Sequence, residues 1–163
     1  MSEEGSVKPY YQDDSVTIYH GDCREALPTL EPVDLVLTDP PYGIGEASGK
    51  THGPRGRLAP ERNYERHDWD KERIPEDLLY LVLGAGSNAI VFGGNYYTDL
   101  LAQNTCWLVW DKHITGDFAD CELAWTTLPG AVRRISYTWN GMIKQRPEQR
   151  FHPTQKPVGV MSW

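Results

Sequence analysis

The stretch Leu35-Val36-Leu37-Thr38-Asp39-Pro40-Pro41-Tyr42-Gly43 decides the fold. Its short apolar run without alternation predicts a strand buried on both faces, as inside a parallel sheet. Ligands of open α/β sheets bind just beyond the carboxyl ends of such strands, where Asp39 stands. The two prolines fix φ and lack N–H donors, so the turn offers mainly acceptors. The Asp39 carboxylate and the Pro40 carbonyl could together hold a group with two N–H bonds, and Tyr42 offers a flat face to a ring. An exocyclic amine on a nucleobase fits that description, and a purely structural turn is the alternative.

The rest of the chain alternates between strand and helix patterns. Further strands are expected at 16–19, 89–92, 107–110 and 122–125. Helices are expected after Asp22, which would cap the first of them with Glu25 in the capping-box position, and over 75–83 and 98–101. This alternation predicts α/β architecture.

Composition favours one folded domain. The chain has 163 residues, of which 39% are hydrophobic and 11% aromatic. The acidic start predicts no secretory signal, and no apolar run reaches membrane-spanning length. The three cysteines, which are Cys23, Cys106 and Cys121, are odd in number and widely spaced. They favour a reduced cytoplasmic protein without a disulfide framework or a zinc site.

The net charge of −7 is unevenly distributed. Residues 1–36 hold eight acids and two basic residues, whereas residues 131–156 hold six basic residues and one acid. The basic stretch includes Arg133 and Arg134, and a local basic face is what phosphate binding needs. A solvated surface explains the same pattern equally well.

A long polar segment over 43–73 follows the turn and carries Arg55, Arg57 and Arg62. It could close over a bound base or clamp a nucleic acid strand, and a disordered surface loop is the alternative. Gly45-Glu46-Ala47-Ser48-Gly49-Lys50-Thr51 ends like a phosphate loop, but its glycine spacing does not match one.

Two motifs together resemble a known family. Asp39-Pro40-Pro41-Tyr42 resembles the Asp-Pro-Pro-Tyr motif of the amino-group DNA methyltransferases, which modify adenine N6 or cytosine N4 with S-adenosylmethionine. About 110 residues later, His152-Pro153-Thr154-Gln155-Lys156-Pro157 resembles a segment of the permuted (β-type) members, many of which are phage-encoded. The segments 93–95, 110–112 and 122–125 also look like this family, so the resemblance covers about residues 14–163.

The resemblance implies a site for each step of the reaction. Asp39, Pro40, Pro41 and Tyr42 would be catalytic, with the target base flipped out of double-stranded DNA and stacked on Tyr42. Aspartate at the first motif position favours adenine over cytosine. Asp22 and Lys156 would contact S-adenosylmethionine, although helix capping also accounts for Asp22. DNA binding is expected at Arg55, Arg57, Arg133 and Arg134, and no metal is expected.

The sequence also departs from the family. A glycine-rich Asp-Pro-Phe-x-Gly-Ser-Gly-Thr loop, which holds the cofactor in the family, would lie beyond Trp163. We therefore expect 1–163 to be the target-base half of one domain, with a mobile loop at 43–73 and the start of the cofactor half at 151–163. Its fold would be a partial Rossmann-like methyltransferase sheet lacking the strands of the cofactor-binding half. We expect it not to methylate DNA alone, to bind the cofactor weakly, and to self-associate or need a complementing fragment. A non-catalytic remnant that binds DNA or a partner is the alternative.

Overall fold

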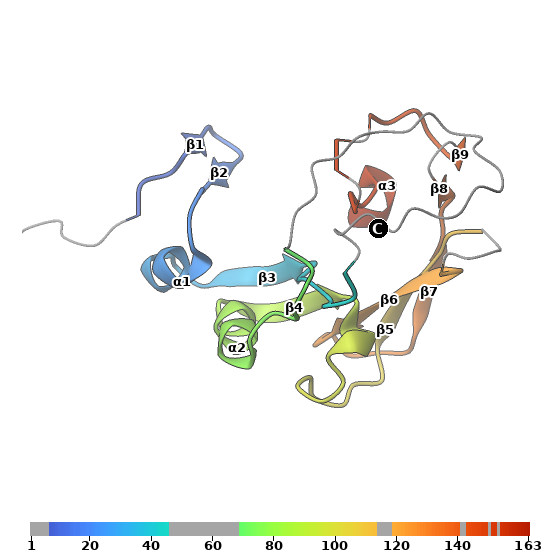
Figure 1. The fold of residues 1–163 in the computed structure, drawn as a ribbon, viewed down its shortest axis with the longest axis horizontal. Coiled ribbons are helices and arrows are strands. Elements are labelled where there is room, and N and C mark those ends of the chain that lie inside the picture. The colour runs from blue at the N-terminus through green and yellow to red at the C-terminus, as the bar shows by residue number, and fades with distance from the viewer. Residues whose placement is uncertain (1–6, 46–68, 114–118, 141–142, 150, 153) are drawn as a thin grey trace, which may run out of the picture.

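The computed structural model describes residues 7–45, 69–113, 119–140, 143–149, 151–152 and 154–163. Its centre is a sheet in the order β3-β4-β6-β5-β7 (Figure 1), formed by β3 (Val33–Thr38), β4 (Gly86–Phe92), β6 (Cys121–Thr126), β5 (Trp107–Asp111) and β7 (Arg133–Ser136). β3 pairs in parallel with β4, β5 pairs in parallel with β7, and β6 is antiparallel to both β4 and β5. It follows that β3, β4, β5 and β7 run in the same direction and that only β6 opposes them. The sheet is compatible with a partial Rossmann-like fold, and the architecture is α/β as predicted.

Helix α2 (Glu76–Gly84) precedes β4 and covers one face of the sheet. Pro75 occupies the N-cap position, and Glu76 and Asp77 place negative charge in the first turn, where the helix dipole favours it. Leu79 is completely buried beneath the sheet, together with the β4 residues Ala89 and Val91. The predicted helix over 75–83 is confirmed.

The opposite face carries a second core cluster. Phe92 of β4 and Trp110 of β5 pack there against Tyr137 and against Val160 of α3 (Val158–Met161). The alternation along β4 explains the two clusters, because successive side chains of a strand point to opposite faces. Trp139 joins this cluster from β8 (Trp139–Asn140), which forms a small hairpin with β9 (Ile143–Lys144).

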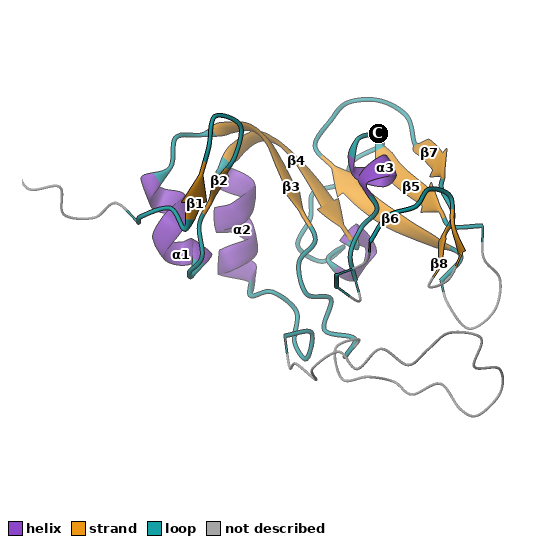
Figure 2. Cartoon of the chain, turned by 90° about the horizontal axis from the view of Figure 1, so that it is seen from above, coloured by secondary structure: helices purple, strands orange, loops and turns teal. Residues whose placement is uncertain are grey.

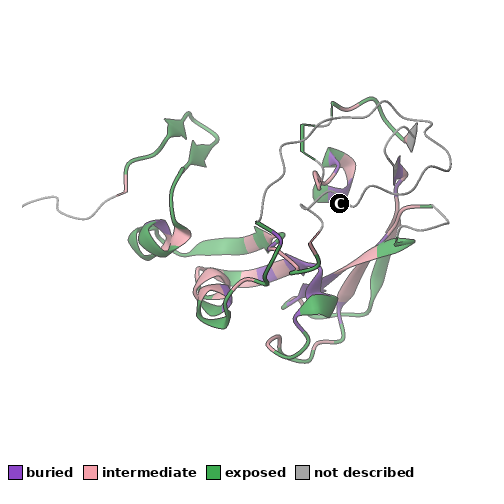
Figure 3. Ribbon diagram, viewed as in Figure 1, coloured by how far each residue is buried: buried purple, intermediate pink, exposed green. Residues whose placement is uncertain are grey.

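The amino-terminal elements lie outside the central sheet. β1 (Tyr11–Gln12) and β2 (Thr17–Ile18) form a separate antiparallel hairpin, which stands apart from β3 in Figure 1 and is exposed in Figure 3. α1 (Cys23–Ala26) and η1 (Leu27–Thr29) follow, and Figure 2 shows α1 beside α2. The strand predicted at 16–19 is therefore a two-residue strand that does not join the main sheet.

The prediction that 35–38 is buried on both faces is wrong. β3 is an edge strand, and Leu35 and Leu37 are 43% and 41% exposed. Only Val36 packs into the cluster beneath α2. The physical reason is that the cluster formed with α3 covers the β4-to-β7 part of the other face and does not extend over β3.

The predicted strands at 89–92, 107–110 and 122–125 are confirmed as parts of β4, β5 and β6. The predicted helix over 98–101 is wrong. The chain forms the 3₁₀ helix η3 (Gly94–Tyr96) instead, followed by a turn in which Tyr97 O accepts from the N–H groups of Leu100 and Leu101. The strands β1, β7, β8 and β9 were not predicted.

Candidate functional site

The candidate site lies at one edge of the sheet, where several strands end together. Asp39 follows the last residue of β3, Gly93 follows β4, and Lys112 follows β5. Because β6 runs in the opposite direction, its beginning lies at the same edge, and Cys121 pairs with Asp111 there. Glu122 therefore lies at the edge that carries the ends of the parallel strands. This is the place where open α/β sheets bind their ligands.

The two sequence motifs meet at Asp39. The Tyr42 hydroxyl donates to Asp39 Oδ1 at 2.5 Å, and the Lys156 ammonium donates to Asp39 Oδ2 at 2.7 Å. Lys156 is 117 residues away along the chain, and its side chain is only 10% exposed. The acid of the first motif and the lysine of the second are therefore in direct contact, with the Asp39 side chain still 32% exposed.

Tyr42 is held on one side by aromatic stacking. Its ring lies on Tyr96 with the centroids 4.8 Å apart and the planes 15° from parallel. Gly93 has φ 67°, and a Cβ placed there would fall 2.1 Å from the Tyr42 ring, so only glycine permits this approach. Burial raises the pKa of the Tyr42 hydroxyl, and the charge of Asp39 raises it further. The phenol therefore stays protonated and keeps donating to Asp39.

The backbone of the turn is anchored by Asp70, which is 1% exposed. Asp70 Oδ1 accepts from the N–H groups of Tyr42 at 2.7 Å and Gly43 at 3.0 Å. These are the first two N–H groups after the prolines, and a charged acceptor makes such bonds stronger. Tyr97 adds a second anchor by donating its hydroxyl to the Pro41 carbonyl, and burial raises its pKa to about 12.

Sequence reasoning missed Asp70, because it lies in the segment 43–73 that was expected to be a mobile loop. Residues 46–68 of that segment, with Arg55, Arg57 and Arg62, lie outside the described part of the chain. The described residues on either side of that gap make specific contacts. Arg73 forms an ion pair with Asp99 at 2.7 Å, and its backbone forms an isolated antiparallel β-bridge with Tyr42. No local pattern marks Asp70 as the partner of the turn.

A line of alternating charges extends from Asp39 across the sheet edge. Lys156 Nζ lies 3.2 Å from Glu122 Oε2, an ionic contact without hydrogen-bond geometry. Lys112 Nζ lies 2.5 Å from the other oxygen of the same carboxylate. Burial alone would raise the pKa of Glu122, but Lys156 and Lys112 outweigh it and lower that pKa. Sequence reasoning noted Glu122 only as part of a strand.

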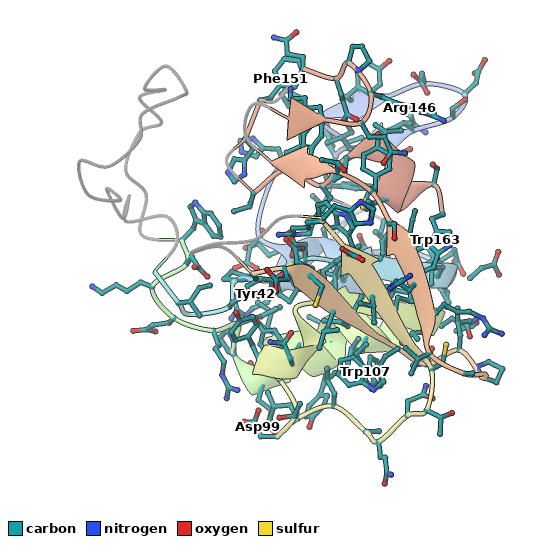
Figure 4. All side chains as sticks on the ribbon, turned by 90° about the vertical axis from the view of Figure 1, so that its right-hand side faces the viewer. Tyr42, Asp99, Trp107, Arg146, Phe151 and Trp163 are labelled. Atoms are coloured by element: carbon teal, nitrogen blue, oxygen red, sulfur yellow. The ribbon has the colours of Figure 1, made fainter. Side chains whose placement is uncertain are left out.

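The second motif is folded so that it places Lys156. Gln155 donates to Glu148 Oε1 at 3.2 Å and accepts from the Phe151 N–H at 2.7 Å, while Pro157 is fully buried. His152 contacts the Thr154 hydroxyl at 3.0 Å, and its ring centroid lies 5.7 Å from that of Trp69. Figure 4 shows Tyr42 at the sheet edge, on the same side as Asp99, with Phe151 in the C-terminal segment farther away.

Asp22, the other predicted cofactor contact, caps α1. Its carboxylate accepts from the Arg24 N–H at 2.9 Å, and this hydrogen bond lowers the pKa of Asp22. The prediction that Asp22 caps this helix is confirmed, whereas the capping-box contact of Glu25 and a cofactor role for Asp22 stay predictions. Figure 1 places α1 near the start of β3, whereas Asp39 follows its end.

The predicted DNA contacts Arg133 and Arg134 lie on the edge strand β7, and both are exposed. Arg134 Nη1 is 3.8 Å from Asp111 Oδ2. These side chains could reach a phosphate backbone, and their role in DNA binding stays a prediction.

Three further observations concern metal ions, cysteines and membrane-spanning helices. Among the described residues there is no group of three or more histidine, cysteine or acidic side chains that could hold a metal ion. All three cysteines are free thiols. Within the same described part of the chain, no helix has the length and apolar character needed to cross a membrane.

Comparison with known proteins gives one partial similarity. The chain is 46% identical over 41 residues to the type II methyltransferase M.ScaI of Streptomyces caespitosus. The match covers 24% of this chain and 14% of that protein. No family model matches the chain, and no solved structure matches it.

Proposed function

We propose that this chain forms the amine-holding part of a DNA methyltransferase that acts on the N6 amine of adenine. The observation that carries the proposal is the meeting of Asp39 and Lys156 at the carboxyl edge of the parallel strands. The similarity to a type II methyltransferase supports the same class of reaction.

The chemistry follows from the poor nucleophilicity of an aromatic amine, whose lone pair is delocalised into the ring. S-adenosylmethionine would supply the methyl group as an electrophilic sulfonium, whose sulfur keeps the electron pair of the broken C–S bond. The amine nitrogen provides the electron pair of the new N–C bond and afterwards releases one proton to solvent. Asp39 and the Pro40 carbonyl accept the two N–H bonds and stabilise the positive charge that develops on nitrogen.

The observed contacts leave capacity for a substrate. Each carboxylate oxygen offers about two acceptor positions, so Asp39 can keep Tyr42 and Lys156 while accepting an amine hydrogen. Tyr96 covers one face of the Tyr42 ring, and Lys156 Nζ lies over the ring at 5.9 Å from its centroid, so a flipped base would stack on the part of the ring that these two groups leave open. Asp22 and Lys156, the predicted cofactor contacts, each already bind a protein group, and a further contact with the cofactor stays a prediction for both.

The test uses a host that lacks adenine-N6 and cytosine-N4 DNA methylation. The 163-residue chain is expressed alone and together with the cofactor half of a permuted amino methyltransferase. The host DNA is digested, and its nucleosides are identified by mass. We expect N6-methyladenine only when both parts are present. Methylated cytosine alone would refute the choice of base, and unmodified DNA in every case would refute the function.

Two substitutions connect this activity to the turn. Asp39→Ala should nearly abolish transfer, because it removes an acceptor that acts as charge develops on nitrogen. Tyr42→Ala should weaken base capture by about 1–3 kcal/mol if stacking dominates. Glu76→Gln is the matched control, because this exposed acid lies in the first turn of α2. Wild-type rates in the first two variants would mean that the turn is only structural.

DNA binding provides a separate test of the proposed partner. We expect the double variant Arg133→Ala/Arg134→Ala to bind duplex DNA more weakly and with a shallower dependence on salt, because fewer counterions are released. Affinity measured by fluorescence anisotropy at several salt concentrations would show this. An unchanged salt dependence of the affinity would mean that β7 does not contact DNA. Arg55 and Arg57 would then remain as the predicted contacts.

A partner-binding remnant is the second candidate function. The exposed side chains of Leu35 and Leu37 on the edge strand β3 favour it, because an unpaired apolar edge is suited to pairing with another chain. Such a remnant would give no methylation in the host test and would still bind a partner or a second copy.

A further inference from the structure

The ammonium of Lys156, on a largely covered side chain, has two acidic neighbours. Its Nζ lies 2.7 Å from Asp39 Oδ2 and 3.2 Å from Glu122 Oε2, and its side chain is 10% exposed. A lysine has a flexible four-carbon stem, and fixing its end costs conformational entropy. Two carboxylates that face the same ammonium offset that cost and give it one position.

The Asp39 carboxylate is consequently held at both oxygens. Tyr42 donates to Oδ1 and Lys156 donates to Oδ2, so the plane of the carboxylate is fixed relative to the turn. A fixed orientation helps a carboxylate to accept a hydrogen bond from one particular N–H group, because a misplaced acceptor loses much of its effect on the reaction rate.

Glu122 has a second consequence for the site. A lone ammonium beside Asp39 would oppose the positive charge that develops on the amine nitrogen. Glu122 shares the charge of Lys156, and Lys112 in turn balances Glu122 at 2.5 Å. With Asp39 itself included, the two acids and two lysines sum to zero formal charge, so the cluster as a whole brings no net positive charge to the site.

We propose that Lys156 is a positioning residue, which is held by Glu122 and orients the Asp39 carboxylate toward the target amine. This inference rests on the proposed function. It assigns to Lys156 a role on the amine side of the reaction, in place of the predicted contact with the cofactor. Glu122 acts one contact farther away, through Lys156.

The first test is spectroscopic and uses the 163-residue chain. Protons of an exposed lysine ammonium exchange with water too rapidly to be observed, whereas a buried, paired ammonium exchanges slowly. We expect a ¹H–¹⁵N ammonium signal from Lys156, identified by its disappearance in Lys156→Arg. Asp39→Asn and Glu122→Gln should each broaden or remove the signal, and Glu76→Gln should leave it unchanged. Absence of the signal in the wild type, or indifference to both substitutions, would overturn the proposal.

The second test separates orientation from cofactor binding in the complemented methylation assay. Lys156→Met should lower kcat at least tenfold, with the KM for S-adenosylmethionine changed less than threefold. Lys156→Arg should restore most of kcat, since a guanidinium can donate to both carboxylates. Glu122→Gln should lower kcat when it is the only substitution, and it should have little further effect when it is combined with Lys156→Met. Circular dichroism checks that each variant is folded.

The outcomes are distinguishable. A raised KM for the cofactor with unchanged kcat would overturn the positioning role and favour cofactor binding. An inactive wild type would refute the proposed function, and the ammonium signal alone would then decide whether Asp39 and Glu122 hold Lys156.

Discussion

Replacing Asp70 by alanine should destabilise the chain far more than the loss of an exposed acid. The substitution removes the acceptor of two N–H groups, those of Tyr42 at 2.7 Å and Gly43 at 3.0 Å. Each buried donor left without a partner costs about 1–3 kcal/mol. Because water can reach part of the turn, we expect the free energy of unfolding to fall by about 2–4 kcal/mol in total.

The matched control is Asp99→Ala, which removes another acid that braces the same region. Its ion pair with Arg73 is exposed, with the two side chains 55% and 42% accessible, and such pairs contribute about 0–1 kcal/mol. Asp70→Asn is a second variant that keeps an oxygen at the same place and loses the charge. We expect its effect to lie between those of the two alanine variants.

Urea unfolding followed by tryptophan fluorescence measures these differences, because Trp110 and Trp125 are buried in the two core clusters. The amide resonances of Tyr42 and Gly43 provide a local readout and should move upfield in Asp70→Ala. A loss below about 1 kcal/mol, no larger than that of Asp99→Ala, would refute the anchoring role of Asp70.

Three further predictions concern the site and the sheet edge. Gly93→Ala should reduce the free energy of unfolding by about 1–3 kcal/mol, because the new Cβ would lie 2.1 Å from the Tyr42 ring. The control Gly84→Ala has open space around its Cβ and should be neutral or stabilising in the same urea experiment. Because the pKa of Glu122 is lowered from its ordinary value of 4.5, its carboxylate stabilises the fold at pH values above 4.5, and this stabilisation is lost as the pH falls through the pKa of the folded state. Glu122→Gln should therefore flatten the acid limb of a plot of stability against pH. An unchanged acid limb would contradict this. Leu37→Lys should reduce self-association in sedimentation velocity without loss of stability, since Leu37 is already 41% exposed, and equal association in both proteins would show that β3 is not the contact.

Local signals in the sequence determined several elements correctly. The apolar runs predicted β4, β5 and β6, and Pro75 with two following acids predicted the start of α2. Asp22 was identified as a helix cap from its position before α1. These features depend on contacts between residues close in sequence, such as capping and strand periodicity, which a sequence pattern records directly.

The exposure of β3 required the tertiary structure. An apolar run shows that a strand can be buried, but whether it is buried depends on which elements cover its two faces. Here α2 covers one face, and the cluster with α3 leaves Leu35 and Leu37 uncovered on the other. The helix predicted over 98–101 does not form for a related reason. The buried Tyr97 donates its hydroxyl to the Pro41 carbonyl, and its own carbonyl accepts the hydrogen bonds of a turn there.

The sequence by itself determined the chemistry of the turn, because Asp39, two prolines and Tyr42 are consecutive and their donors and acceptors follow from residue type. Only the tertiary structure decided which groups hold that turn. Asp70 is 28 residues from Tyr42, and Lys156 is 117 residues from Asp39. Glu122 reaches the same edge only because β6 runs against its neighbours. Such partners are selected by strand order and direction, which arise from the packing of the whole sheet and leave no mark on the local sequence.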